Sequence, residues 1–128
     1  MASRVFLGVS ALMWLPYGLM CLAKPSLVEG AAGVAATTAT GTIELRAMYG
    51  GLQIAIGVLC VLGCMSSTWR RQALTTLGVL YAGLGLARLA GIAAGGGMSS
   101  YTAVALAIEL ASTVLAFTLA RRSAAALG

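Results

Sequence analysis

Apolar residues dominate four long stretches of the chain, and shorter polar or glycine-containing segments separate them. The apolar stretches cover residues 5–23, 43–65, 74–92 and 102–120. Each is close in length to the roughly 20 residues that a helix needs to cross the hydrocarbon core of a bilayer. No segment alternates apolar and polar residues as a half-buried strand does. The pattern predicts an all-α integral membrane protein, with one domain over residues 1–128 built as a bundle of four transmembrane helices.

The segments between the stretches have the composition of loops, because they contain a proline, a pair of arginines and three consecutive glycines. These predicted loops are residues 24–42, 66–73 and 93–101. The first apolar stretch has a second interpretation as a secretory signal that follows the basic Arg4 and ends at the small Ala23. Its apolar part exceeds the usual length of about 7–15 residues, which favours a membrane helix.

Composition supports the membrane assignment. Apolar residues make up 60% of the 128 residues and charged residues 9%, whereas about a quarter of an ordinary soluble domain is charged. The mean hydropathy is +0.98. This composition excludes a soluble globule, a disordered chain, a nucleic-acid-binding domain and a disulfide-rich secreted module. The expected partner is the lipid bilayer, and nucleic acid is not expected.

The arginines outside the apolar stretches predict the orientation. Cytoplasmic segments of membrane proteins are enriched in Lys and Arg. If the four helices alternate in direction, five arginines fall on one side of the membrane: Arg4, Arg70, Arg71, Arg121 and Arg122. The first loop on the other side has only one Lys and one Glu, and the second has no charge. Both termini are therefore predicted to be cytoplasmic.

Four further charged residues lie within or at the edge of the apolar stretches, namely Glu44, Arg46, Arg88 and Glu109. Each would cost about 2.5–3.5 kcal/mol unpaired at the centre of a transmembrane helix. All four fall in the predicted outer half, so two acids and two bases could neutralise one another. We expect Glu109 to pair with Arg46 or Arg88, and Glu44 to pair with the remaining base.

Helical spacing places polar or small residues in one stripe on each of the last three helices. The predicted stripes are Arg46, Gly50, Gln53 and Gly57 with Tyr49 beside them, then Gly78, Tyr81, Gly85 and Arg88, then Glu109, Ser112 and Thr113. Small residues four apart form separate ladders that could let backbones approach closely. These ladders are Ala47/Gly51/Ala55, Gly83/Ala87/Gly91 and Ala103/Ala107/Ala111. Converging stripes predict a compact bundle with a polar interior that opens, if anywhere, toward the outside.

A weak internal repeat relates the two halves of the chain and suggests two repeated helical hairpins. In each half a tyrosine is followed by a base late in the first helix, and a glutamate comes early in the second. The matched pairs are Tyr17 with Tyr81, Lys24 with Arg88, and Glu44 with Glu109. Because both hairpins would start on the same side, the relating axis would run along the membrane normal.

Candidate chemistry is sparse. The chain has no His and no Asp, and its three Glu residues do not form a metal-ligand pattern. The three cysteines form no Cys-x-x-Cys motif and are expected to be small buried residues. We therefore expect no catalytic residue, metal or cofactor. A quinone- or lipid-modifying enzyme that uses only Arg, Glu and Tyr stays open as an alternative.

The segment from Glu44 to Gly51 reads Glu-Leu-Arg-Ala-Met-Tyr-Gly-Gly, and Arg88 and Glu109 follow in the third and fourth helices. With this pattern the chain resembles a bacterial four-helix membrane family described as a domain of unknown function (4345 type), and more distantly DoxX-like proteins. The resemblance spans nearly the whole chain and implies a four-helix fold in the bacterial inner membrane. Family members often have an acidic residue in the loop after the third helix, and this chain has none there.

Two classes of function are compatible with the polar residues. In the first, the charges form a closed lock that fixes helix packing or a contact with a partner, including a second copy of the chain. In the second, the protein binds or carries an amphiphilic or anionic ligand such as a lipid, a quinone or an organic anion. The candidate site comprises Glu44, Arg46, Tyr49, Gly50, Gly51, Gln53, Tyr81, Arg88 and Glu109. Because the charges balance, the lock is the preferred hypothesis.

Overall fold

The computed structural model describes residues 1–125, and residues 126–128 of the predicted domain lie outside the described part. Four helical segments are long and apolar enough to span a membrane. In chain order the elements are α1 (Ala2–Ala23), α2 (Leu27–Ala32), α3 (Ala39–Leu45), the π-helix η1 (Arg46–Gly51), α4 (Leu52–Met65), α5 (Ser67–Ala93) and α6 (Ser100–Ala125). No strand occurs within residues 1–125. The predicted all-α class with four transmembrane helices is confirmed.

The connections are shorter than predicted at one end of the molecule. The predicted loop 66–73 is wrong, because Ser66 alone separates α4 from α5 and its backbone is extended (φ −120°, ψ 132°). Trp69, Arg70 and Arg71 therefore lie on the first two turns of α5. Tryptophan and polar residues are common where a spanning helix reaches the lipid headgroups. Helix α5 therefore begins before its apolar stretch, at Ser67.

At the other end, the long first connection contains a helix that the apolar pattern did not predict. The short helix α2 ends at Gly33, whose φ of +70° closes it in the left-handed conformation that glycine adopts without strain. Thr38 then caps α3 by accepting a hydrogen bond from the N–H of Gly41 at 3.0 Å. The second loop, between α5 and α6, turns at Gly95 with a φ of +99°.

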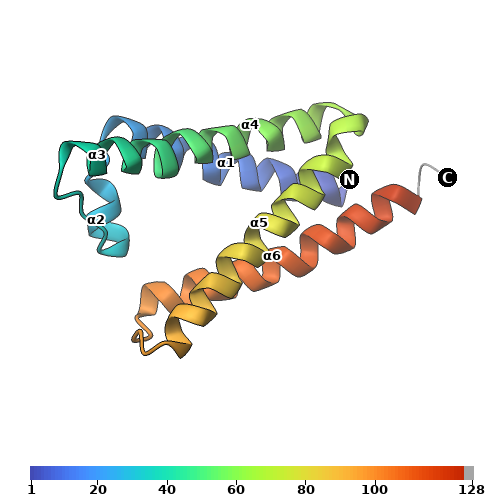
Figure 1. Cartoon of the computed structure of the whole chain (residues 1–128). Coiled ribbons are helices and arrows are strands. Elements are labelled where there is room, and N and C mark those ends of the chain that lie inside the picture. The colour runs from blue at the N-terminus through green and yellow to red at the C-terminus, as the bar shows by residue number, and fades with distance from the viewer. Residues whose placement is uncertain (126–128) are drawn as a thin grey trace.

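Two helical hairpins make up the fold (Figure 1). In the first, α1 packs along η1 and α4; in the second, α5 packs along α6; and α4 contacts α5 where the hairpins are joined. We call the end at which α1 begins, α4 turns into α5 and α6 ends the terminal end, and the opposite end the loop end. The main apolar core lies toward the terminal end and consists of Leu7, Ala11, Ile56, Cys60, Ala73, Leu74, Leu77, Tyr81, Ala116, Leu119 and Ala120.

Toward the loop end the hairpins diverge (Figure 1). There α1, α2 and α3 form a small separate cluster of Cys21, Val28 and Leu45. The prediction of a compact bundle is therefore wrong for this half, since all four helices meet only in the terminal half. The core residues of α1 come from its first half, and those of α4, Ile56 and Cys60, from its middle. The four-helix contact therefore uses only part of each helix.

The predicted polar stripes are the buried faces of the helices, with Arg46 as the exception. Gly50, Gln53 and Gly57 are buried between α4 and α1, while Gly78, Tyr81 and Gly85 are buried on α5. Glu109 is buried on α6. A lipid-facing surface disfavours polar side chains, so these turn toward protein, and the glycines beside them let the helices approach closely.

The prediction that the small-residue ladders form packing surfaces is wrong. All nine of these residues are exposed, and nothing lies within 4 Å of the position that a Cβ would occupy at Gly83 or Gly91. Close approach occurs instead at the glycines of the buried stripes. A Cβ at Gly50 would lie 2.9 Å from Leu22 Cα, and a Cβ at Gly57 would lie 2.5 Å from Leu15 Cγ.

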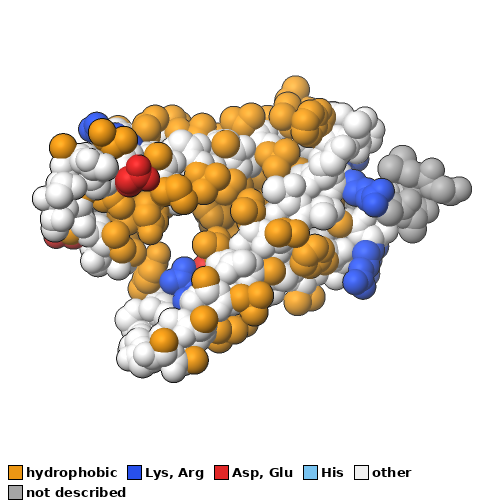
Figure 2. Space-filling view, in the orientation of Figure 1, with side chains coloured by type: hydrophobic (Ala, Val, Ile, Leu, Met, Phe, Trp, Pro, Cys, Tyr) orange, Lys and Arg blue, Asp and Glu red, His pale blue; other side chains and the backbone are white. Residues whose placement is uncertain are grey.

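Apolar side chains cover much of the outer surface (Figure 2). Leu12 is 77% exposed and Val114 is 67% exposed. Such exposure would be costly in water but is favourable against acyl chains. The four apolar helices and this surface are those of a multi-pass membrane protein in contact with a bilayer.

Candidate functional site

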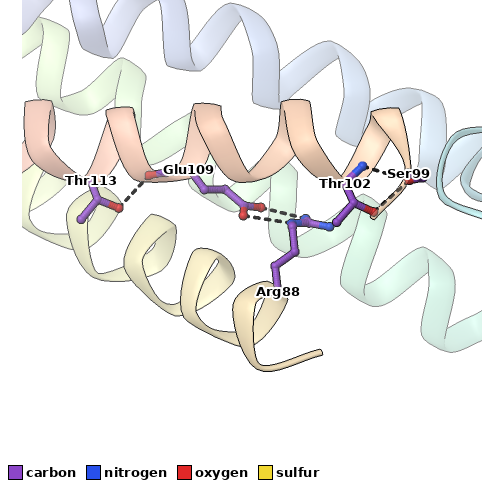
Figure 3. Close-up of polar contacts among 5 residues, drawn as sticks. All are labelled: Arg88, Ser99, Thr102, Glu109 and Thr113. Carbon is purple, nitrogen blue, oxygen red and sulfur yellow. Dashed lines mark hydrogen bonds and ion pairs between the residues drawn. The ribbon is translucent and has the colours of Figure 1, made fainter. Parts of the chain in front are cut away.

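The central feature of the site is an ion pair between α5 and α6. Arg88 donates from Nε to Glu109 Oε2 at 3.0 Å and from Nη2 to Glu109 Oε1 at 2.8 Å. Figure 3 shows the two side chains pointing toward each other from neighbouring helices. This bidentate arrangement matches the planar fork of a guanidinium to the two oxygens of a carboxylate.

Neighbouring residues hold the pair in place. The ring of Tyr101, at the start of α6, lies 5.8 Å from the guanidinium carbon of Arg88, within the range of a cation–π contact. Thr113 donates from its hydroxyl to the backbone carbonyl of Glu109 at 2.7 Å. Gly85, one turn before Arg88, leaves room for the Glu109 side chain, since a Cβ there would be 3.6 Å from Glu109 Cβ. The pair is thus fixed by contacts within the α5–α6 hairpin.

The two members of the pair differ in exposure. The Glu109 side chain is 8% exposed, whereas 25% of the Arg88 side chain is exposed. A buried carboxylate is costly unless a base neutralises it and donates hydrogen bonds to it. Arg88 supplies both, so Glu109 is satisfied internally while Arg88 keeps one exposed side.

Glu44 and Arg46 do not join the pair. Both are exposed on the α1–α4 hairpin, and the Arg88–Glu109 pair is the one salt bridge found in residues 1–125. Of the two bases considered for Glu109, the structure selects Arg88. The expected pairing of Glu44 with the remaining base, Arg46, is wrong, and so is the single cluster of four charges.

The π-helix η1 explains why Arg46 leaves its predicted stripe. The N–H of Leu52 bonds to the carbonyl of Ala47, five residues earlier, where an α-helix would use the fourth. One additional residue in a turn rotates the preceding segment by about 100° relative to the following one. Gly50 and Gln53 therefore stay on the buried face while Arg46 turns outward.

The tyrosine and glycines of the same motif take different positions. Tyr49 is half-buried and packs against the cluster of α1, α2 and α3. Gly50 is pressed against the backbone of Leu22 in α1. Gly51 is exposed, with only the carbonyl of Arg46 near its Cβ position, at 4.0 Å. The buried glycine thus serves tight helix crossing.

The remaining predicted residues lie deeper in the molecule. Tyr81 is 3% exposed and accepts a hydrogen bond from Trp14 Nε1 at 3.0 Å, with the ring centroids 5.9 Å apart. This contact joins α1 to α5 and was not predicted from the sequence. Gln53 is buried, and its Oε1 has no hydrogen-bond partner. The predicted site is therefore divided among the ion pair, the α1–α4 crossing and the Trp14–Tyr81 contact.

Cys21, Cys60 and Cys64 are free thiols, and the first two are fully buried. Cys21 and Cys60 pack as small buried side chains, as expected, whereas Cys64 is partly exposed and donates from Sγ to the backbone carbonyl of Arg4 at 3.4 Å. Within residues 1–125 no group of three His, Cys, Asp or Glu side chains could hold a metal ion.

A second feature was missed. At the terminal end a cavity of about 580 Å³ is lined by Arg4, Arg70, Arg71 and Arg122. The clustering of these arginines on one side of the membrane was visible in the sequence, where it served only to predict orientation. That they share one cavity follows from the packing of α1, α5 and α6.

The fold and the site define a multi-pass α-helical membrane protein with an intramembrane Arg–Glu pair. Residues 2–120 match the family model described as Domain of unknown function (DUF4345), and the chain belongs to this family. The resemblance recognised in the sequence is thereby confirmed for this family, while the DoxX-like relationship and the bacterial origin stay predictions. No curated protein and no solved structure matches the chain.

Proposed function

We propose that the protein is a non-catalytic protein of the bacterial inner membrane in which the Arg88–Glu109 pair locks α5 against α6. The bidentate geometry, with nitrogen–oxygen distances of 2.8 and 3.0 Å, is the observation on which the proposal rests. A closed pair neutralises both charges within the membrane-spanning part of the hairpin. The lock presents a rigid α5–α6 hairpin to lipid or to a partner protein, including a second copy of the chain.

The lock predicts a specific pattern of stability changes. Arg88→Gln should lower the free energy of unfolding by about 3–5 kcal/mol, because Glu109 then stays buried without its base. Glu109→Gln should lower it by less, because the remaining Arg88 side chain is 25% exposed. The double variant should recover part of this loss, since neither charge is then present. Thermal unfolding in detergent micelles measures all three.

Glu44→Gln and Arg46→Gln are the matched controls, because both residues are exposed and neither forms a salt bridge in the described chain. They should change stability by less than about 0.5 kcal/mol. A double variant whose loss equals the sum of the two single losses would contradict the lock.

A binder or carrier of an anionic or amphiphilic ligand is the second candidate, supported by the exposed side of Arg88. Figure 2 shows an opening between the diverging hairpins, with a basic side chain at its rim on the α5–α6 side. A carboxylate or phosphate entering there could reach the 25% of Arg88 that Glu109 leaves uncovered. A thermal-shift screen of lipids, quinones and organic anions tests this candidate, and a stabilising ligand whose effect disappears in Arg88→Gln would favour it over the lock.

A further inference from the structure

A cavity at the terminal end is lined by basic residues, and none of its lining residues in the described part of the chain is acidic. It has a volume of about 580 Å³, and α1, α5 and α6 line it with Arg4, Arg70, Arg71, Arg122, Ser67 and Ser123. The three Glu residues of the chain all lie elsewhere. Four guanidinium groups around one cavity repel one another unless an anion enters.

Arg70 supplies an unpaired donor in this cluster. Its Nε donates to the carbonyl of Gly63 at the end of α4, at 3.2 Å, which anchors the guanidinium. Its Nη2 is buried and has no hydrogen-bond partner among residues 1–125. A buried cationic N–H group without an acceptor is unfavourable, so a small shift of the Arg70 side chain that brings Nη2 to an oxygen of a bound anion would complete its hydrogen bonding.

Two helix starts add to the positive potential. α1 begins at Ala2 and α5 begins at Ser67, both of which line the cavity, and no side chain caps either helix. The first N–H groups of a helix have no partner within the helix and favour a negative charge. In this cavity, these N–H groups add to the positive potential of the arginines and of the unpaired Arg70 Nη2.

The depth of the cavity indicates the source of the anion. Three spanning segments begin or end beside it, at Ala2, Ser67 and Ser123, so it lies where the hydrocarbon region gives way to headgroups. Trp69 is 46% exposed on the same turn of α5, and tryptophan is enriched at this level of the bilayer. Basic pockets between transmembrane helices bind the headgroups of anionic lipids.

We infer that this cavity is a binding site for the phosphate group of an anionic phospholipid, with arginines from α1, α5 and α6 as its ligands. A bound lipid would tie the three helix ends together at the terminal end. The site is separate from the Arg88–Glu109 pair, which lies toward the loop end, so the two proposals are independent.

The experiment measures binding of phosphatidylglycerol to the full chain in non-ionic micelles by native mass spectrometry, with phosphatidylcholine as the zwitterionic reference. Arg122→Gln should weaken phosphatidylglycerol binding about tenfold, the usual size for one lost charge-assisted hydrogen bond. Arg122 is exposed, so its substitution should leave the fold intact.

Arg121→Gln is the matched control, because Arg121 is the adjacent exposed arginine and does not line the cavity. It should retain affinity within about twofold, consistent with the small value of exposed charges. Equal losses in the two variants, or equal binding of phosphatidylcholine, would overturn the site. Arg122-dependent binding of inorganic phosphate without binding of phosphatidylglycerol would overturn the assignment to a lipid.

Discussion

Individual glycines set how closely α1 approaches α4. Gly18 and Gly50 face each other across the crossing, where a Cβ at Gly18 would lie 3.0 Å from the carbonyl oxygen of Gly50. Gly57 makes a similar approach to Leu15 further along the helix. Backbone cannot move aside as a flexible side chain can, so these positions exclude larger residues.

Gly50→Ala should therefore lower the free energy of unfolding by about 1–3 kcal/mol, the usual cost of overpacking a close contact. Gly83→Ala is the matched control, because nothing lies within 4 Å of its Cβ position. Alanine favours helix over glycine by about 1 kcal/mol, so the control should be neutral or slightly stabilising. Thermal unfolding in micelles compares the two, and an unchanged Gly50→Ala protein would contradict the close crossing.

The charged residues show how much of the site could be predicted from the sequence. The need for Glu109 to find a base follows from the cost of a charge in lipid, and the sequence narrowed the choice to Arg46 or Arg88. Choosing between them required the rotation of each helix about its axis. The π-helix changes that rotation for Arg46, and its i→i+5 hydrogen bonding has no clear signature in the apolar pattern.

Among the elements, η1 has the largest effect on the loop end. It joins α3 to α4 with an offset that places Leu45, 9% exposed, against Cys21 and Val28. An uninterrupted α-helix would turn Leu45 away from this cluster by about 100°. The Glu-x-Arg-x-x-Tyr-Gly-Gly motif overlaps this π-helix, so the motif is here a determinant of helix geometry.

Deletion of Ala47, an exposed residue of η1, should convert the π-turn to an α-turn and rotate α3. In a cysteine-free background, Leu45→Cys should be protected from a maleimide at full length and become reactive after the deletion. Ile43→Cys replaces a residue that is 62% exposed, so its reactivity should change in the opposite direction, from labelled at full length to protected after the deletion. The length-preserving Ala47→Val is the control and should leave both labelling rates unchanged, whereas continued protection of Leu45→Cys in the deletion would contradict the proposed rotation.

Taken together, the hairpins form a molecule that is closed at the terminal end and open at the loop end (Figure 1). The shared core, the Trp14–Tyr81 contact and the arginine cavity join α1, α5 and their neighbours in the closed half. The ion pair lies in the open half, within one hairpin. The charge pattern predicts that the terminal end is cytoplasmic.

Labelling of single cysteines in intact cells tests this orientation. Met98→Cys in the α5–α6 loop and Met65→Cys at the end of α4 replace residues that are 61% and 78% exposed. In a cysteine-free background, a membrane-impermeant maleimide should label Met98→Cys directly. It should label Met65→Cys only after permeabilisation, and the reverse pattern would place the termini outside.

The four spanning segments and the buried faces of the last three of them, apart from Arg46, could be derived from the order of residues alone. Transfer into lipid depends on local composition and helical period, and both are visible in one segment at a time. Four features could not be derived in this way: the partner of Glu109, the exposure of Arg46, the diverging loop end and the shared arginine cavity. Each depends on how helices are rotated and spaced relative to one another, and in a bilayer apolarity does not discriminate between such arrangements, because lipid is as apolar as a neighbouring helix. Glycine contacts, a π-turn and one bidentate ion pair select among them, and these form only when segments distant in sequence meet.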